Sequence, residues 1–145
     1  MKLPDTNVLI YAANAKAAQH RRAKEWLVGA YAEPAGVGLA WLALIGFLRL
    51  ATRPGILARP LAIDDALGLV HDWLAHPRAQ VLQADADHET VLAALLRSLG
   101  SAGNLVSDAH LAGLAIEHGA TLGSFDRDFL RFEDLELLRL TARSH

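Results

Sequence analysis

The sequence contains no cysteine at any of its 145 positions. This absence excludes a disulfide framework, a zinc site built on thiolates and a cysteine nucleophile. The chain also lacks any apolar run long enough to cross a bilayer, and its first five residues already include charged side chains. We therefore expect a soluble cytoplasmic protein with no membrane segment, whose metal ligands could only be oxygen or imidazole groups.

Lysine is scarce as well, since it occurs only at Lys2, Lys16 and Lys24, and the formal net charge is −2. A protein that binds nucleic acid through bulk electrostatics carries a clearly basic surface. Any contact with nucleic acid must therefore be local. Arginine recurs along the chain, and its guanidinium group is suited to bidentate contacts with phosphate.

The chain does have enough apolar material for one core. Hydrophobic residues make up 52% of it, and its length is ordinary for one domain. No repeat, low-complexity tract or linker divides it. We expect a single domain that covers residues 1–145.

Apolar residues at helical spacing predict several amphipathic helices between short apolar runs that predict strands. The helical sets are Ala23, Trp26, Leu27, Ala30 and Tyr31; Trp41, Leu44, Ile45 and Leu48; Ile63, Ala66, Leu67, Val70 and Leu74; Val91, Leu92, Leu95, Leu96 and Leu99; and Leu111, Leu114 and Ala115. The strand candidates are residues 37–40, 80–83, 120–123 and 136–140. Strands that alternate with helices imply right-handed crossovers, so we expect an α/β fold with a mainly parallel sheet covered on both faces.

Three aspartates occur at the junctions of these elements. Asp5 and Asp126 each follow a candidate strand, and Asp108 opens a helix for which Ser107 is the expected cap. Taken singly, each acid is explained as a turn residue, a helix cap or a loop residue. Open α/β sheets, however, bind ligands beyond the carboxyl ends of their strands, where such junctions meet. Converging carboxylates form a site for a hard divalent cation such as Mg²⁺ or Mn²⁺.

At this point the chain resembles a known family, the PIN-domain ribonucleases, and within it the VapC toxins of bacterial toxin–antitoxin pairs. The resemblance covers nearly the whole sequence. It is carried by the segments 5–12 (DTNVLIYA), 41–49 with Phe47-Leu48-Arg49, 103–112 (GNLVSDAHLA), 117–121 (EHGAT) and 124–132 (SFDRDFLRF).

The resemblance implies a three-layer α/β/α sandwich and a metal-dependent endoribonuclease that hydrolyses RNA with metal-activated water, leaving 5′-phosphate and 3′-hydroxyl ends. Asp5, Asp108 and Asp126 match the acids that hold Mg²⁺ or Mn²⁺ and serve catalysis. Asn7 and Ser124 match polar residues that orient bound water and neighbouring carboxylates. The implied partners are an RNA substrate, a second copy of the chain in a homodimer, and a small VapB-like antitoxin that occupies the active site.

The sequence departs from the family pattern at Gly46, where the usual residue is a glutamate. Loss of this carboxylate weakens a second metal position more than the first. We therefore predict one well-occupied metal in the absence of substrate, and a second that binds only together with RNA phosphate.

Other polar residues allow two interpretations. Arg49 and Arg53 share the helix face opposite the apolar set, where they could guide RNA phosphates or simply form a solvated face. For Asp128, capping of a short helix is favoured over metal binding. His110 lies about 200° around the helix from Asp108, which favours a structural role.

Two functions of other classes compete with the nuclease. A phosphoacceptor signalling domain also has an acidic Mg²⁺ pocket on a parallel sheet, but it needs a late lysine, and none follows Lys24. The other alternative is a catalytically silent PIN-like module that binds RNA or a protein partner, for which Gly46 would be a sign of decay. The presence of Asp5, Asp108 and Asp126 together argues against this module.

Overall fold

The computed structural model describes residues 1–100 and 103–142, and this part of the chain contains one five-stranded sheet. Its strands are β1 (Lys2–Pro4), β2 (Val37–Leu39), β3 (Ala79–Val81), β4 (Thr121–Ser124) and β5 (Leu137–Arg139). They lie in the order β3-β2-β1-β4-β5, and all four pairings are parallel. The four strands predicted from the sequence overlap β2 to β5.

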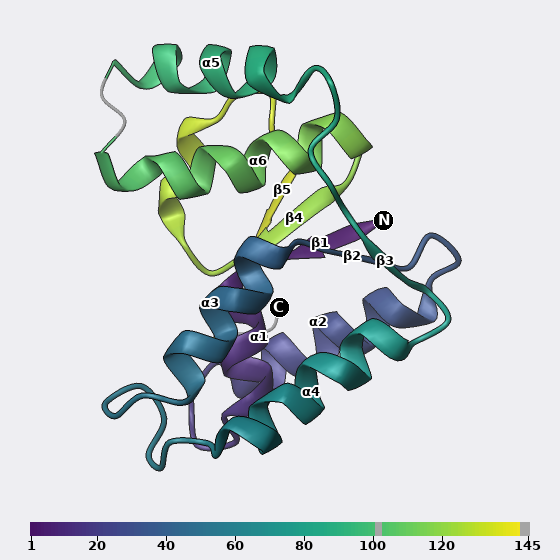
Figure 1. Ribbon diagram of the computed structural model, residues 1–145, viewed down its shortest axis with the longest axis vertical. Helices are drawn as coiled ribbons and strands as arrows, with labels where there is room; N and C mark the ends of the chain where they lie inside the picture. The colour runs from purple at the N-terminus through teal and green to yellow at the C-terminus, as the bar shows by residue number, and fades with distance from the viewer. Residues whose placement is uncertain (101–102, 143–145) are drawn as a thin grey trace.

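Helices cover both faces of the sheet, which confirms the predicted α/β/α sandwich (Figure 1). One face carries α1 (Thr6–Ala13), α2 (His20–Ala32), α3 (Trp41–Ala51) and α4 (Ile63–Ala75). The other carries α5 (His88–Leu99) and α6 (Val106–His118), together with the short 3₁₀ segments η1 (Gly103–Leu105) and η2 (Arg127–Arg131). Each face has its own apolar cluster, one around Leu9 and Phe47 and the other around Leu122 and Phe129. No helix in the described residues is long and apolar enough to span a membrane.

The strand order places the first strand at the centre of the sheet. From β1 the chain moves outward through β2 to β3, then returns through α5 and α6 to place β4 on the opposite side of β1. In register, Pro4 pairs with Gly123, and the Asp5 amide donates to the Gly123 carbonyl at 2.9 Å. The direction of winding therefore reverses between β1 and β4, which is the place where α/β sheets form a ligand crevice.

Helix α3 differs from its predicted packing. The sequence pattern assigns Trp41 and Ile45 to the buried face, but these side chains are 47% and 57% exposed. The buried residues are instead Ala43, Leu44 and Phe47, together with Ala51. The small residues Ala43 and Gly46 lie close to Thr6 of α1, so this side of α3 faces the neighbouring helix.

The sequence predicts a cap at each end of α6, and only one of the two predictions is confirmed. Gly119 caps its C-terminus with a φ of 61°, as the sequence predicts. The prediction that Ser107 caps the N-terminus is wrong, because the helix begins at Val106 and its N-cap position is Leu105. The 3₁₀ turn η1 runs directly into α6, so Ser107 already lies inside the first helical turn.

Candidate metal centre

Asp5 is held at the exit of β1 by two hydrogen bonds. One carboxylate oxygen accepts from the Thr6 amide at 2.7 Å and thereby caps α1, and the other accepts from the Ser124 hydroxyl at 2.7 Å. These bonds fix the direction of the carboxylate while leaving lone pairs on both oxygens for a cation.

Ser124 is fully buried at the end of β4 and connects the two sides of the site. Its hydroxyl donates to Asp5 and accepts from the Asn7 side chain at 3.2 Å and from the Asp126 amide at 3.0 Å. Asn7 in turn accepts from the Phe125 amide at 3.2 Å. The hydroxyl thus has neither a proton nor a lone pair to spare, so its geometry suits it to positioning Asp5 and the loop rather than to binding water.

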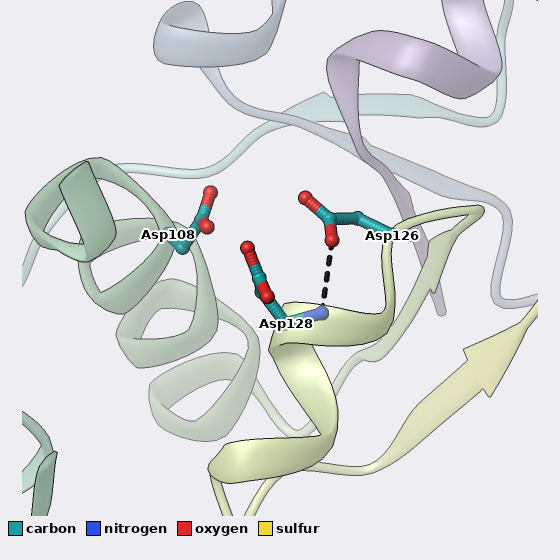
Figure 2. Close-up of side chains that lie close together, drawn as sticks. All are labelled: Asp108, Asp126 and Asp128. Carbon is teal, nitrogen blue, oxygen red and sulfur yellow. Dashed lines mark hydrogen bonds between the residues drawn. The ribbon is translucent and has the colours of Figure 1, made fainter.

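Three further carboxylates converge from α6 and η2 (Figure 2). One oxygen from each of Asp108, Asp126 and Asp128 lies within 4.8 Å of those of the other two. Asp126 caps η2 by accepting from the Asp128 amide at 2.9 Å. The predicted role of Asp128 as the cap is therefore wrong, because the acid two residues earlier performs it and the Asp128 carboxylate points toward Asp108 and Asp126 instead.

The four acids act on one another electrostatically. Burial raises the pKa of Asp108 to about 6, and the negative charges of Asp5, Asp126 and Asp128 add to this effect. Burial also raises the pKa of Asp5, and the charge of Asp126 contributes in the same direction, although hydrogen bonds from Ser124 and Thr6 oppose it. Raised pKa values are the expected result when like charges share a partly desolvated site.

No basic side chain neutralises this cluster within the described residues. The ion pairs in the described part of the chain join Lys2 to Glu33, Arg21 to Glu25 and His88 to Glu117, and none of them includes a residue of the acidic group. Half-buried carboxylates at this spacing with no cationic partner fit a divalent metal ion, which prefers oxygen ligands and would remove the repulsion. Asp5, Asp108, Asp126 and Asp128 are the residues that could hold it.

Asp5, Asp108 and Asp126 open into a cavity of about 580 Å³, whereas Asp128 is not among the residues that line it. Asp5, Asn7, Ser107, Asp108 and Asp126 line its polar part. The remaining wall comes largely from α1, α3 and the loop after α3, and it includes the apolar side chains of Ile10, Leu42, Ile45 and Ile56. With a divalent cation bound at the acids, a polyanion could place one phosphate there and rest its less polar parts on the opposite wall.

The two predicted arginines differ in position. Arg49 lines the cavity, whereas Arg53 is exposed on the loop after α3 and is not among the lining residues. Gly46 also lines the cavity, at the closest approach of α3 to Thr6. Sequence reasoning missed Thr6, whose only signal was its place directly after the first acid.

His110 lies outside the cavity lining. Its Nδ1 atom lies 2.8 Å from Nε2 of His88, and the other nitrogen of His88 bonds to the Glu117 carboxylate. This places His110 in a contact between α5 and α6, in line with the structural role expected for it.

Comparison with known proteins identifies the family to which this chain is similar. The family model described as PIN domain matches residues 2–135. The chain is 46% identical to Ribonuclease VapC37 of Mycobacterium tuberculosis over 133 residues, which is 92% of each protein. It is 41% identical to Ribonuclease VapC33 of the same organism over 136 residues, which cover 94% of this chain and 95% of that protein.

Solved structures with the same fold have lower sequence identity. The crystal structure of Mycobacterium tuberculosis VapC20, described as a toxin that cleaves the sarcin-ricin loop, superposes with a TM-score of 0.67 at 20% identity over 94% of this chain and 98% of that one. VapBC2 from Rickettsia felis, bound to a DNA fragment from its promoter, gives a TM-score of 0.67 at 19% identity over 95% and 97% of the two chains. From its fold, its acidic cavity and its similarity to curated relatives, we conclude that this chain belongs to the PIN-domain family, among the VapC ribonucleases.

Proposed function

We propose that this protein is a Mg²⁺- or Mn²⁺-dependent endoribonuclease, the toxin of a toxin–antitoxin pair, and that it acts in the cytoplasm as a single PIN domain. The observation that supports this proposal most is the convergence of acids from the exits of β1 and β4 and the start of α6 on one cavity. The names of the relatives, which are ribonucleases, point to the same reaction.

In this proposal Asp5, Asp108 and Asp126 hold the cation and serve catalysis. A cation bound there lowers the pKa of a coordinated water and polarises a phosphoryl oxygen. Asn7 and Ser124 keep Asp5 and the loop of Asp126 in place through their shared hydrogen bonds. Arg49 lies on the cavity wall, where its guanidinium can contact a phosphate next to the scissile one. Arg53 is too far along the loop to line the cavity and would contact RNA only outside it.

The test is cleavage of end-labelled structured RNA by the purified full-length chain with Mg²⁺, with Mn²⁺ and with excess EDTA. We expect cleavage only with metal, and products with 5′-phosphate ends. Asp5→Asn should abolish cleavage yet remain folded, because the amide oxygen can still accept the Thr6 bond and the fall in charge repulsion offsets the lost hydrogen bond from Ser124. Asp65→Asn is the matched control, since Asp65 is an exposed acid on α4 and is not among the residues that line the cavity. Cleavage that survives both EDTA and Asp5→Asn would refute the proposal.

The same assay separates the nuclease from the silent PIN-like module. Such a module would bind RNA or a partner without producing new RNA ends under any metal condition. Sequencing of RNA ends after controlled expression, beside the Asp5→Asn variant, would identify the substrate class.

We also propose an antitoxin and a second copy of the chain as partners. The antitoxin is supported by the structural relatives, which include complexes titled VapBC and FitAB. The dimer is supported by the apolar side chain of Trp41 on α3, which is 47% exposed and lies outside the cavity lining, unlike Leu42 and Ile45. Sedimentation of the purified chain should give a dimer that Trp41→Asp converts to monomer; a monomeric wild-type protein would contradict this part of the proposal.

A further inference from the structure

Position 46 lies where the backbones of α1 and α3 come close together. A Cβ atom built on Gly46 would lie 2.7 Å from Oγ1 of Thr6, which is closer than real Cβ contacts, and 3.1 Å from Cγ2 of Thr6, which is tighter than most of them. The Thr6 side chain is not free to turn aside without loss, because its hydroxyl donates to the Ala43 carbonyl at 3.2 Å. The glutamate of the family pattern would have to displace the Thr6 side chain from this position, and α3 carries no other acid.

Asp128 supplies a carboxylate from a different part of the fold. It lies at the start of η2, across from Asp108 on α6 (Figure 2). Its charge is one of the causes that raise the pKa of Asp108, so the two carboxylates share one electrostatic environment. The side chains of Asp108 and Asp128 form no hydrogen bond in the described part of the chain, whereas both oxygens of Asp5 are engaged.

The backbone that carries Asp128 is fixed from both sides. On one side the Asp126 carboxylate accepts from the Asp128 amide. On the other side the next residue, Phe129, is fully buried in the apolar cluster beneath α6, with Phe132 beside it. A ligand held by packing and by a backbone hydrogen bond keeps its direction before the metal binds, which is a requirement of a preorganised site.

We propose that Asp128 is a metal ligand and replaces the carboxylate that α3 lacks at Gly46. The inference rests on the proposed function. The first metal position would then be formed by Asp108, Asp126 and Asp128, three carboxylates on the α6 and η2 side. Asp5 lies outside this group of three and lines the cavity together with Asp108 and Asp126. The carboxylate that α3 lacks would be supplied by the 3₁₀ turn after β4.

The test is direct binding of Mn²⁺ to metal-free full-length protein, measured by titration calorimetry and by the electron paramagnetic resonance signal of free Mn²⁺. Asp128→Asn should weaken Mn²⁺ binding by roughly tenfold or more. Asp134→Asn is the matched control, because Asp134 is an exposed acid shortly after η2 and takes no part in the acidic cluster. It should bind Mn²⁺ as wild type does, and circular dichroism of the metal-free proteins should show both variants to be folded.

The outcomes separate this inference from the proposed function. If wild type binds Mn²⁺ and cleaves RNA while Asp128→Asn binds Mn²⁺ as tightly, the assignment of Asp128 is overturned and the nuclease stands. A wild-type protein that neither binds Mn²⁺ nor cleaves RNA overturns both. If Asp128→Asn has lost its fold, Asp128→Glu, which keeps the carboxylate, must restore most of the Mn²⁺ binding, and failure to do so also overturns the assignment.

Discussion

At the scale of single residues, the site depends on contacts between neighbours that no isolated residue reveals. In the sequence, Gly46 stands where the family usually has a catalytic glutamate, so it suggests the loss of an acid. In the structure it is a packing residue, whose missing side chain lets Thr6 lie against α3. Asp128 reads as a helix cap, yet Asp126 performs that role and leaves Asp128 to face the other acids.

The contact between Thr6 and Gly46 predicts a strong coupling between two substitutions. Gly46→Ala should destabilise the protein by about 1–3 kcal/mol, because overpacking outweighs the gain in helix propensity of roughly 1 kcal/mol. In a Thr6→Ala background the two nearest atoms are gone, so the same substitution should be neutral or stabilising. Urea unfolding of the four proteins measures this cycle. Equal effects of Gly46→Ala in both backgrounds would show that the contact is not tight.

The raised pKa of Asp108 predicts how the stability of the metal-free protein depends on pH. Its pKa is about 6 in the folded protein against 3.8 in the unfolded chain, so the folded state holds the proton more tightly. The stabilising effect of protonation is complete below 3.8 and is lost as the pH rises through about 6. Asp108→Asn should therefore match wild type in Tm near pH 4 and exceed it at pH 7.5. Thermal melts in EDTA test this, and a constant difference across the range would contradict it.

At the scale of elements, the helix pair α5 and α6 is joined by a buried polar contact. The side chains of His88 and Glu117 are only 12% and 3% exposed, and His88 also lies against His110. Gly113 makes room for this contact, since a Cβ there would lie 3.2 Å from the His88 ring. Because α6 also carries Asp108, this contact supports the helix that presents one of the acids.

Removal of the His88 ring should show how much this contact contributes to the free energy of unfolding. His88→Ala leaves the buried Glu117 carboxylate with only the Asp85 amide as a hydrogen-bond donor, at 3.4 Å, and we expect this loss to cost about 1–3 kcal/mol. His71→Ala, at an exposed histidine on α4, is the matched control and should change stability little. Urea unfolding and amide exchange along α5 provide the measurements. The contact would be unimportant if both variants unfolded at the same urea concentration.

At the scale of the whole molecule, the reversal of strand order brings together residues from the two ends of the chain. Asp5 and Ser124 are 119 positions apart, yet they share a hydrogen bond because β1 and β4 are neighbours. The cation site is thus formed by residues at β1, β4, α6 and η2, so a bound metal would link elements that are far apart in the sequence.

Metal binding should accordingly stabilise the entire fold. At a free Mn²⁺ concentration 100 times the Kd, binding contributes about 2.7 kcal/mol, which for a protein of this size raises Tm by roughly 5–10 °C. Differential scanning calorimetry with and without Mn²⁺ measures the shift. Asp108→Asn should show little of it; a shift of the same size in that variant would place the stabilising ion elsewhere.

The sequence by itself determined most of the elements and the family of this protein. Helical and strand periods depend on neighbours within a few positions, so strands β2 to β5 and helices α2 to α6 could be predicted, whereas α1 was not. The ordered acidic motifs pointed to the PIN fold. Tertiary structure alone decided the face that α3 buries, the access of Arg49 but not Arg53 to the cavity, the close approach of Gly46 to Thr6 and the place of Asp128 among the acids. These depend on distances between segments far apart in the chain, and local pattern carries no information about such distances.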